Sequence, residues 1–291
     1  MIKNSLLNPA NKNCKVKGNG FTLIELIIVI VLLSILAVGS VKFISFSAQG
    51  YVDTVRRSEL SSTGTIVNEK ISRLVRDALP NSIRVTADSR CLELIPIIGA
   101  SQYIQAPFVY SPTSISRTEL HMVPLDSASS NNGFLAIYPS PNQQDSLYSG
   151  SDNPGFISLQ TVTFDSTTAD GASVYIFNSL ASFEFQQESP NKRVFITTGP
   201  VAFCQDGDRL YFYRNYGFVP NVANLYTNLP ATLPNRLLVA DKILLNSLVF
   251  THLPVSLRRN AVVAYELEFQ DDSNESETHA VNQEVQIRNV P

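Results

Sequence analysis

The longest apolar run of the chain lies near its beginning, over residues 21–41. Polar residues occur at only four positions in it: Thr22, Glu25, Ser34 and Ser40. Its length matches the roughly 20 residues that cross a hydrocarbon core as a helix. We therefore predict a membrane-spanning helix over residues 21–41. A secretory signal peptide is the alternative, although its apolar region is usually about 7–15 residues long and is followed by small residues at a cleavage site.

A second hydrophobic pattern follows directly, with apolar residues recurring every three or four positions and charged residues between them. This period predicts an amphipathic helix. Its apolar positions are Tyr51, Val52, Val55, Ile66, Val67, Ile71, Leu74, Val75 and Leu79. Because no proline interrupts residues 21–79 and Pro80 supplies a stop, one long helix over 21–79 is the simplest prediction. Gly39, Gly50 and Gly64 are positions where it could bend.

After Pro80 the pattern changes to short β-rich runs separated by turn residues. The runs are SIRVTA, CLELIPI, FLAIYP, FISLQTVTF, SVYIFN, SFEFQ, RVFITT, RLYFYRNY, LLNSLVFTHL, AVVAYELEF and EVQIRNV. Asp206-Gly207 between two of them predicts a tight hairpin, and residues 125–155, rich in Ser, Asn, Pro and Gly, predict a long surface excursion. The expected fold class is α+β: a long N-terminal helix packed on an antiparallel, β-rich domain over residues 80–291.

Composition and charge narrow the function. The chain has 291 residues, a hydrophobic fraction of 44% and a formal net charge of −3. Four lysines and no acidic residue precede Gly20, so the net charge of the rest of the chain is more negative than that of the whole. Such a charge does not favour binding to nucleic acid. Lysines on the amino side of a span tend to stay cytoplasmic, which places the long remainder outside the cytoplasm.

Glu25 is the unusual residue of the apolar run. An ionisable residue inside a membrane span is a functional hypothesis by default, and its partner is expected to carry a positive charge. Because Glu25 stands only five residues into the run, the alternative is a tolerated glutamate that reaches the head groups.

The segment GFTLIELIIVIVLLSILA, which begins at Gly20, resembles the amino-terminal signature of type IV prepilins and type II secretion pseudopilins. The resemblance implies a leader over residues 1–20, cleavage by a prepilin peptidase between Gly20 and Phe21, and methylation of the new amino terminus at Phe21. It also implies that Glu25 pairs with the amino terminus of a neighbouring pilin, which sets the register of assembly on an inner-membrane platform. Docking at a wrong offset would bury unpaired charges, which is unfavourable.

Over most of the chain the sequence also resembles a narrower group, the minor pilins of MSHA-type (mannose-sensitive haemagglutinin) pili, which are linked to surface adhesion. The matching stretches are RLVRDALPNSIRV, CLELIPI, VAFCQDGDRLYFYRNYGF and NQEVQIRNVP. The J-type minor pseudopilins of type II secretion are similar in the helix end and the large β domain, and they remain the alternative. The leader is longer than in many type IVa prepilins, and the helix lacks the proline found in many major pilins.

Three cysteines are present, of which Cys14 lies in the expected leader. The remaining pair, Cys91 and Cys204, indicates a disulfide outside the cytoplasm. Two buried free thiols are the alternative.

Candidate catalytic and metal-binding residues are few. His121, His252 and His279 are widely spaced and form no metal-binding motif, and no nucleophile or phosphate-loop signature is present. Asp165, Asp170, Asp271, Asp272, Glu275 and Glu277 could offer oxygen ligands to calcium but lack EF-hand spacing, so solvated acidic loops are expected. We expect no enzyme activity, cofactor or metal; a membrane-tethered enzyme or receptor would need a constellation that the sequence does not show.

Overall fold

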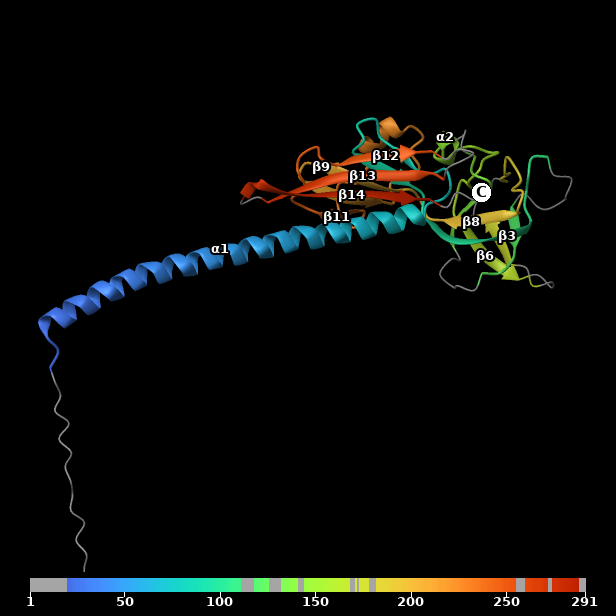
Figure 1. Cartoon of the computed structure of the whole chain (residues 1–291). Helices are drawn as coiled ribbons and strands as arrows, with labels where there is room; N and C mark the ends of the chain where they lie inside the picture. Colours follow the sequence, from blue (N-terminus) through green and yellow to red (C-terminus); the bar gives the residue numbers. More distant parts are fainter. Residues whose placement is uncertain are drawn as a thin grey trace, which may run out of the picture. The chain divides into compact units, whose positions relative to one another are not determined.

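The computed structural model describes residues 20–110, 118–125, 132–140, 144–167, 171, 173–177, 182–254, 260–271 and 274–287. The chain divides into two units at the step from Val55 to Arg56. One helix, α1 (Leu23–Arg76), belongs to both, and all strands lie in the second unit. The expected α+β class, a long apolar helix followed by an antiparallel β-rich domain, is confirmed (Figure 1).

In the first unit the described chain is almost entirely helical, and its side chains are exposed on every side. The large apolar residues from Phe21 to Phe46 each expose 42–79% of their surface. A helix that is apolar all round buries itself in a membrane or against other proteins. α1 carries an apolar window long enough to cross a membrane, as the sequence predicts.

In the second unit α1 buries one face, at Leu60, Gly64, Val67, Ile71, Ser72 and Val75. The predicted amphipathic stripe is therefore right from Val67 onward. It is wrong for Tyr51, Val52, Val55 and Ile66, which are 72%, 43%, 46% and 61% exposed. Ile66 points away because its neighbour Val67 occupies the packed face, and successive helical residues are about 100° apart.

The helix ends at Arg76, three residues before the predicted end. The chain leaves the helix here to pair with the segment that follows β2: Ile97 N donates to Asp77 O at 2.8 Å, and Leu79 N donates to Ile95 O at 2.7 Å. Pro80 disfavours helical geometry in the residue before it, which agrees with this exit.

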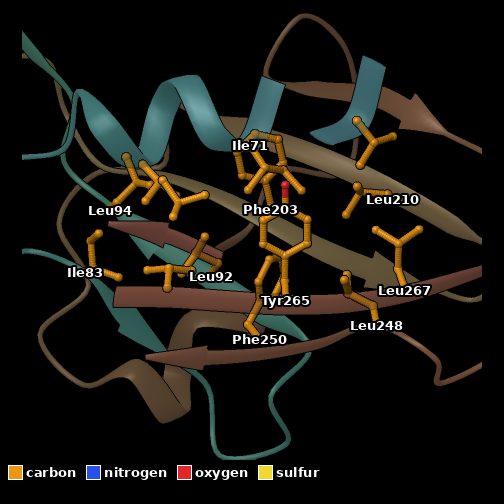
Figure 2. Close-up of a cluster of buried hydrophobic side chains, with 14 of the residues drawn as sticks. Ile71, Ile83, Leu92, Leu94, Phe203, Leu210, Leu248, Phe250, Tyr265 and Leu267 are labelled. Atoms are coloured by element: carbon orange, nitrogen blue, oxygen red, sulfur yellow. The ribbon is translucent and has the colours of Figure 1, made fainter. Parts of the chain in front are cut away.

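Two antiparallel sheets share a core with α1. The first sheet has the order β1 (Arg84–Val85), β2 (Cys91–Leu94), β9 (Val201–Asp206), β10 (Arg209–Arg214), β11 (Arg236–Ala240), and the second has β12 (Val249–Leu253), β13 (Val262–Asp271), β14 (Asn274–Gln286). Figure 2 shows Ile71 of the helix above Phe203 of the first sheet and Tyr265 of the second. The helix is thus the common element that both sheets pack against.

A closed barrel is inserted between β2 and β9. Its strands, in the order β3 (Ile97–Gln105), β4 (Glu119–Met122), β7 (Ser173–Phe177), β6 (Val162–Thr167), β5 (Asn132–Ala136), β8 (Arg193–Thr197), enclose a core of their own. Closing a sheet on itself removes the unpaired edges that favour aggregation. The barrel therefore has a core of its own, and a second buried cluster, which includes Leu79, Tyr148 and Phe195, packs it against the rest of the domain.

The cysteine pair joins the two strands between which the barrel is inserted, at the end of the pair away from the barrel. Cys91 of β2 and Cys204 of β9 are directly opposite each other in register, 113 positions apart in sequence, and their Sγ atoms lie at the disulfide distance of 1.91 Å. Since β2 leads into the barrel and β9 follows it, the cross-link ties the two strands from which the insertion begins and ends.

Several strand predictions need correction. β3, β4 and β11 were not expected, and SFEFQ forms only isolated bridges through Phe185. The excursion over residues 125–155 is wrong in part, since β5 and the short helix α2 (Gln144–Leu147) lie in it and Ile137, Leu147 and Tyr148 are buried.

The expected acidic loop around Asp271 is instead the end of a hairpin between β13 and β14. The short elements η3 (Val222–Asn224) and α3 (Leu225–Asn228) complete the described chain.

Candidate functional site

The start of α1 is the candidate site, and Thr22 organises it. The Glu25 backbone N–H donates to Thr22 Oγ1 at 3.3 Å, and Leu26 N donates to Thr22 O at 3.1 Å. A threonine that caps the third helical residue, with glutamate at that residue, forms the Thr-x-x-Glu pattern of a capping box. A capping role for Thr22 was not predicted from the sequence, although the Thr-x-x-Glu spacing is a signal for one.

Glu25 lies in the first turn of the helix. The unpaired N–H groups and the dipole make this end of a helix favourable for a carboxylate. Among the described residues no side chain forms a hydrogen bond or ion pair with the Glu25 carboxylate. Within the part of the chain that the structure covers, the carboxylate is thus available to a group from another molecule.

The other polar residues of the span bond to their own helix. Ser34 Oγ donates to Val31 O at 2.7 Å, and Ser40 Oγ donates to Leu36 O at 2.8 Å. Such back-bonding satisfies a hydroxyl where no water is present. It does not provide a positive partner for a carboxylate, so Glu25 differs in kind from the serines.

The peptide bond between Gly20 and Phe21 precedes the first helical residue. Phe21 is 79% exposed, and an added Cβ at Gly20 would meet nothing within 4 Å. Packing against the described residues therefore does not require a glycine at position 20. A requirement for glycine there would come from another molecule, such as an enzyme that accepts the backbone closely.

The length of the apolar segment fits a bilayer. From Leu23 to Val41 a helix rises about 28 Å at 1.5 Å per residue, close to the roughly 30 Å of a hydrocarbon core. The helix α1 is continuous from Leu23 to Arg76 (Figure 1), so neither Gly39 nor Gly50 interrupts it. Apolar character and length together are consistent with membrane anchoring.

The histidines lie on strands or close to the helix. His121 of β4 has its Nε2 3.8 Å from Glu119 Oε2, and His279 of β14 lies beside Gly64 of the helix. His252 of β12 is partly buried, and burial lowers its pKa below 6.5. Among the residues that the structure describes, no three His, Cys, Asp or Glu side chains are grouped to hold a metal. Asp170 and Asp272, and the side chains of Asp165, Asp271, Glu275 and Glu277, lie outside the described part.

A buried ion pair was not foreseen from the sequence. Arg84 Nε lies 2.5 Å from Glu93 Oε2, and both side chains are at least 95% buried. Burial raises the pKa of the Glu93 carboxyl, while Arg84 and a hydrogen bond from Tyr216 oppose that shift. Arg84 also donates to the carbonyls of Val219 and Pro220. Because the charges and donors are paired with each other, we interpret this network as part of the β1–β2 scaffold.

The comparisons with known proteins agree with the site. The family model for the prokaryotic N-terminal methylation motif matches residues 17–41, which include Gly20, Phe21, Thr22 and Glu25. This match supports a type IV pilin-like protein that is processed at its N-terminus. Comparison of the chain with curated proteins and with solved structures found no match.

Proposed function

We propose that this protein is a minor subunit of a type IV pilus, made as a prepilin and incorporated into the filament. Residues 1–20 are the leader, the prepilin peptidase cuts between Gly20 and Phe21, and Phe21 becomes the methylated amino terminus. The helix α1 (Leu23–Arg76) is the assembly helix, and residues 21–41 anchor it in the inner membrane. Residues 80–291 form the domain that lies in the periplasm before assembly and on the cell surface afterwards.

One observation carries the proposal: the methylation motif coincides with a capped helix start whose carboxylate has no partner among the described residues. In an assembled filament the α-amino group at Phe21 of a neighbouring subunit supplies the positive charge that Glu25 lacks. The exposed apolar side chains of the first unit support the same proposal, because they need either lipid or other helices around them. The function is structural, with no catalytic residues and no cofactor.

The cysteine pair supports a location outside the cytoplasm. Disulfides persist in the oxidising periplasm and at the cell surface, and they are rare in the cytosol. Cys91 and Cys204 lie at disulfide distance, and the lysines before Gly20 favour a cytoplasmic amino end. A periplasmic body on a single membrane helix satisfies both features.

Within the pilins, our proposal is the MSHA type, and specifically a minor pilin of the MshO kind that functions in or primes a filament for surface adhesion. It rests on the sequence stretches at the helix end and around Cys91 and Cys204. A J-type pseudopilin of a type II secretion machine is the second candidate, since it shares the processed helix and the large β domain. The genes beside this one, for a pilus or for secretion, separate the two.

The test uses two variants, Glu25→Leu and Glu25→Gln. Incorporation is measured as the amount of the protein in sheared filaments relative to its amount in the membrane. We expect cleavage to persist and incorporation to fall about tenfold or more, the change that the loss of about 1.4 kcal/mol produces. Glu59→Gln on the same helix is the matched control and leaves incorporation unchanged. Full incorporation of Glu25→Leu would contradict the proposed pairing.

A further inference from the structure

A cleft of about 300 Å³ lies beside the disulfide on the first sheet. It is lined by Cys204, Gln205 and Asp206 of β9, Tyr213 of β10, Arg236 of β11, and Tyr226, Leu229, Pro230 and Ala231 of the segment between them. Clefts of this volume are at the lower end of those that enclose small-molecule ligands. Nothing in the proposed assembly role uses this cleft.

Two opposite charges are held together at the cleft. Arg236 Nη2 donates to Asp206 Oδ2 at 2.5 Å, and the guanidinium carbon lies 3.7 Å from the centre of the Tyr211 ring. The ion pair and the ring orient the guanidinium. Because the charges offset each other, the pair has little attraction for a lone anion or cation. The pair still presents the N–H donors of Arg236 beside the carboxylate acceptors of Asp206. A hydroxyl group can accept a hydrogen bond from the first and donate one to the second.

The guanidinium retains unused hydrogen-bonding capacity. Arg236 Nε is buried and has no acceptor among the described residues, although the side chain as a whole remains 23% exposed. A buried donor without an acceptor is unfavourable, and native structures rarely keep one. A small rotation of the guanidinium toward a ligand oxygen in the cleft would give this donor an acceptor.

The ring of Tyr226 lines the same cleft as the Arg236–Asp206 pair. Tyr226 is 44% exposed, and its hydroxyl donates to Asp88 Oδ2 at 2.7 Å. Asp88 Oδ1 in turn accepts from Thr86 Oγ1 at 2.6 Å. The ring is therefore held in place before any ligand arrives, which lowers the entropy lost on binding. Burial and the hydrogen bond to Asp88 raise the pKa of Tyr226 to about 12, so its hydroxyl stays protonated at neutral pH.

We propose that this cleft binds a neutral, polyhydroxylated ring of monosaccharide size. An aromatic side chain with its neighbours Leu229 and Pro230 offers an apolar surface to the C–H face of such a ring. The Arg236–Asp206 pair then donates to and accepts from adjacent hydroxyls on its edge. The proposal does not depend on processing or assembly, so either can fail without the other.

Saturation-transfer NMR on the full-length chain tests the proposal. The protein is held in a zwitterionic detergent, because a maltoside detergent would itself carry sugar rings. The probes are the methyl glycosides of glucose, galactose and N-acetylglucosamine, with inorganic phosphate and acetate as charged comparators. We expect at least one glycoside to receive saturation with millimolar affinity, about 1 mM, and the charged comparators not to displace it.

Variants locate the binding. Tyr226→Ala removes the exposed ring and is expected to weaken the glycoside about tenfold, whereas Tyr226→Phe keeps the ring and weakens it less. Tyr110→Ala is the matched control, since Tyr110 is 91% exposed and does not line the cleft. Thermal unfolding confirms that each variant is folded. Absence of saturation for all three glycosides, equal binding by Tyr226→Ala and wild type, or displacement by phosphate would overturn the proposal.

Discussion

The two halves of α1 differ in what surrounds them, although they form one helix. Between Leu23 and Val55 the apolar side chains are exposed all round. From Leu60 to Val75 only one face is buried, and the β strands of the same chain cover it. The second half has its partner within the molecule, whereas the first half needs lipid or another subunit.

Glycine has a different role in each half, which sharpens the contrast. An added Cβ at Gly64 would lie 2.8 Å from Val281 Cγ2, so this glycine lets the helix approach β14 closely. At Gly39 and Gly50 an added Cβ would meet none of the described residues within 4 Å. The contrast predicts that substitutions in the second half lower the stability of the domain and that those in the first half do not.

The largest effect is expected from removing the disulfide. In chain-entropy models a cross-link over a loop of this length contributes about 4–5 kcal/mol, so Cys91→Ala with Cys204→Ala should lower the free energy of unfolding by up to that amount. Urea unfolding of the full-length chain in micelles, followed by near-ultraviolet circular dichroism, measures it. The far-ultraviolet helical signal of the first half of α1 should persist after the domain unfolds. An unchanged unfolding midpoint would show that the cross-link between β2 and β9 does not stabilise the domain.

A matched pair of isoleucines tests the burial contrast next. Ile71 is fully buried between the two sheets, and Ile35 is 64% exposed. Ile71→Ala should destabilise the domain by about 2–5 kcal/mol, as large-to-small core substitutions do. Ile35→Ala should change its unfolding by less than about 0.5 kcal/mol. Equal losses for both variants in the same urea titration would contradict the division of α1.

The glycines give a smaller effect of the same kind. Gly64→Leu overfills the contact with Val281 and should destabilise the domain by about 1–3 kcal/mol. Gly50→Leu meets open space, and its better helix propensity should leave domain stability unchanged or slightly higher. Thermal unfolding of the two variants side by side measures the difference, and a stable Gly64→Leu would indicate that β14 does not pack closely on the helix.

The smallest expected effect is the contribution of His252 to the pH dependence of the free energy of unfolding. Burial lowers its pKa below the ordinary 6.5, so the unfolded chain takes up a proton at this position before the folded chain does. The free energy of unfolding should therefore fall as the pH drops through 6.5. His252→Gln should flatten this part of the profile between pH 7.5 and about 5. An identical slope in wild type and variant would assign the pH dependence to other groups.

Much of this arrangement could be predicted from the pattern of residues. The apolar run, the helical period from Val67 onward and the pair Cys91 and Cys204 are local or countable signals, and the hairpin at Asp206-Gly207 follows from turn chemistry. The proposed processing residues were predicted in the same way, because the signature from Gly20 to Glu25 is continuous in sequence.

The barrel and the ends of the apolar stripe could not be predicted from the same signals. β3 and β4 pair with strands far away in sequence, and β3 contains Gly99 and polar residues that do not alternate clearly. The Arg84–Glu93 pair and the Arg236 cleft depend on pairings across the first sheet that no local spacing indicates. Whether Val55 is packed or exposed depends on how far the sheets reach along the helix, which is a tertiary property.

Mass spectrometry of the amino terminus, with and without co-expressed prepilin peptidase, tests the central claim most directly. A Gly20→Val variant is the control, since the added side chain meets none of the described residues and should disturb only recognition by the peptidase. We predict a peptide that begins at methylated Phe21 only when the peptidase is present, and an intact leader in the variant. An intact leader in every sample, or a cut near residue 40, would contradict processing at Gly20 and with it the assembly of this helix into a pilus.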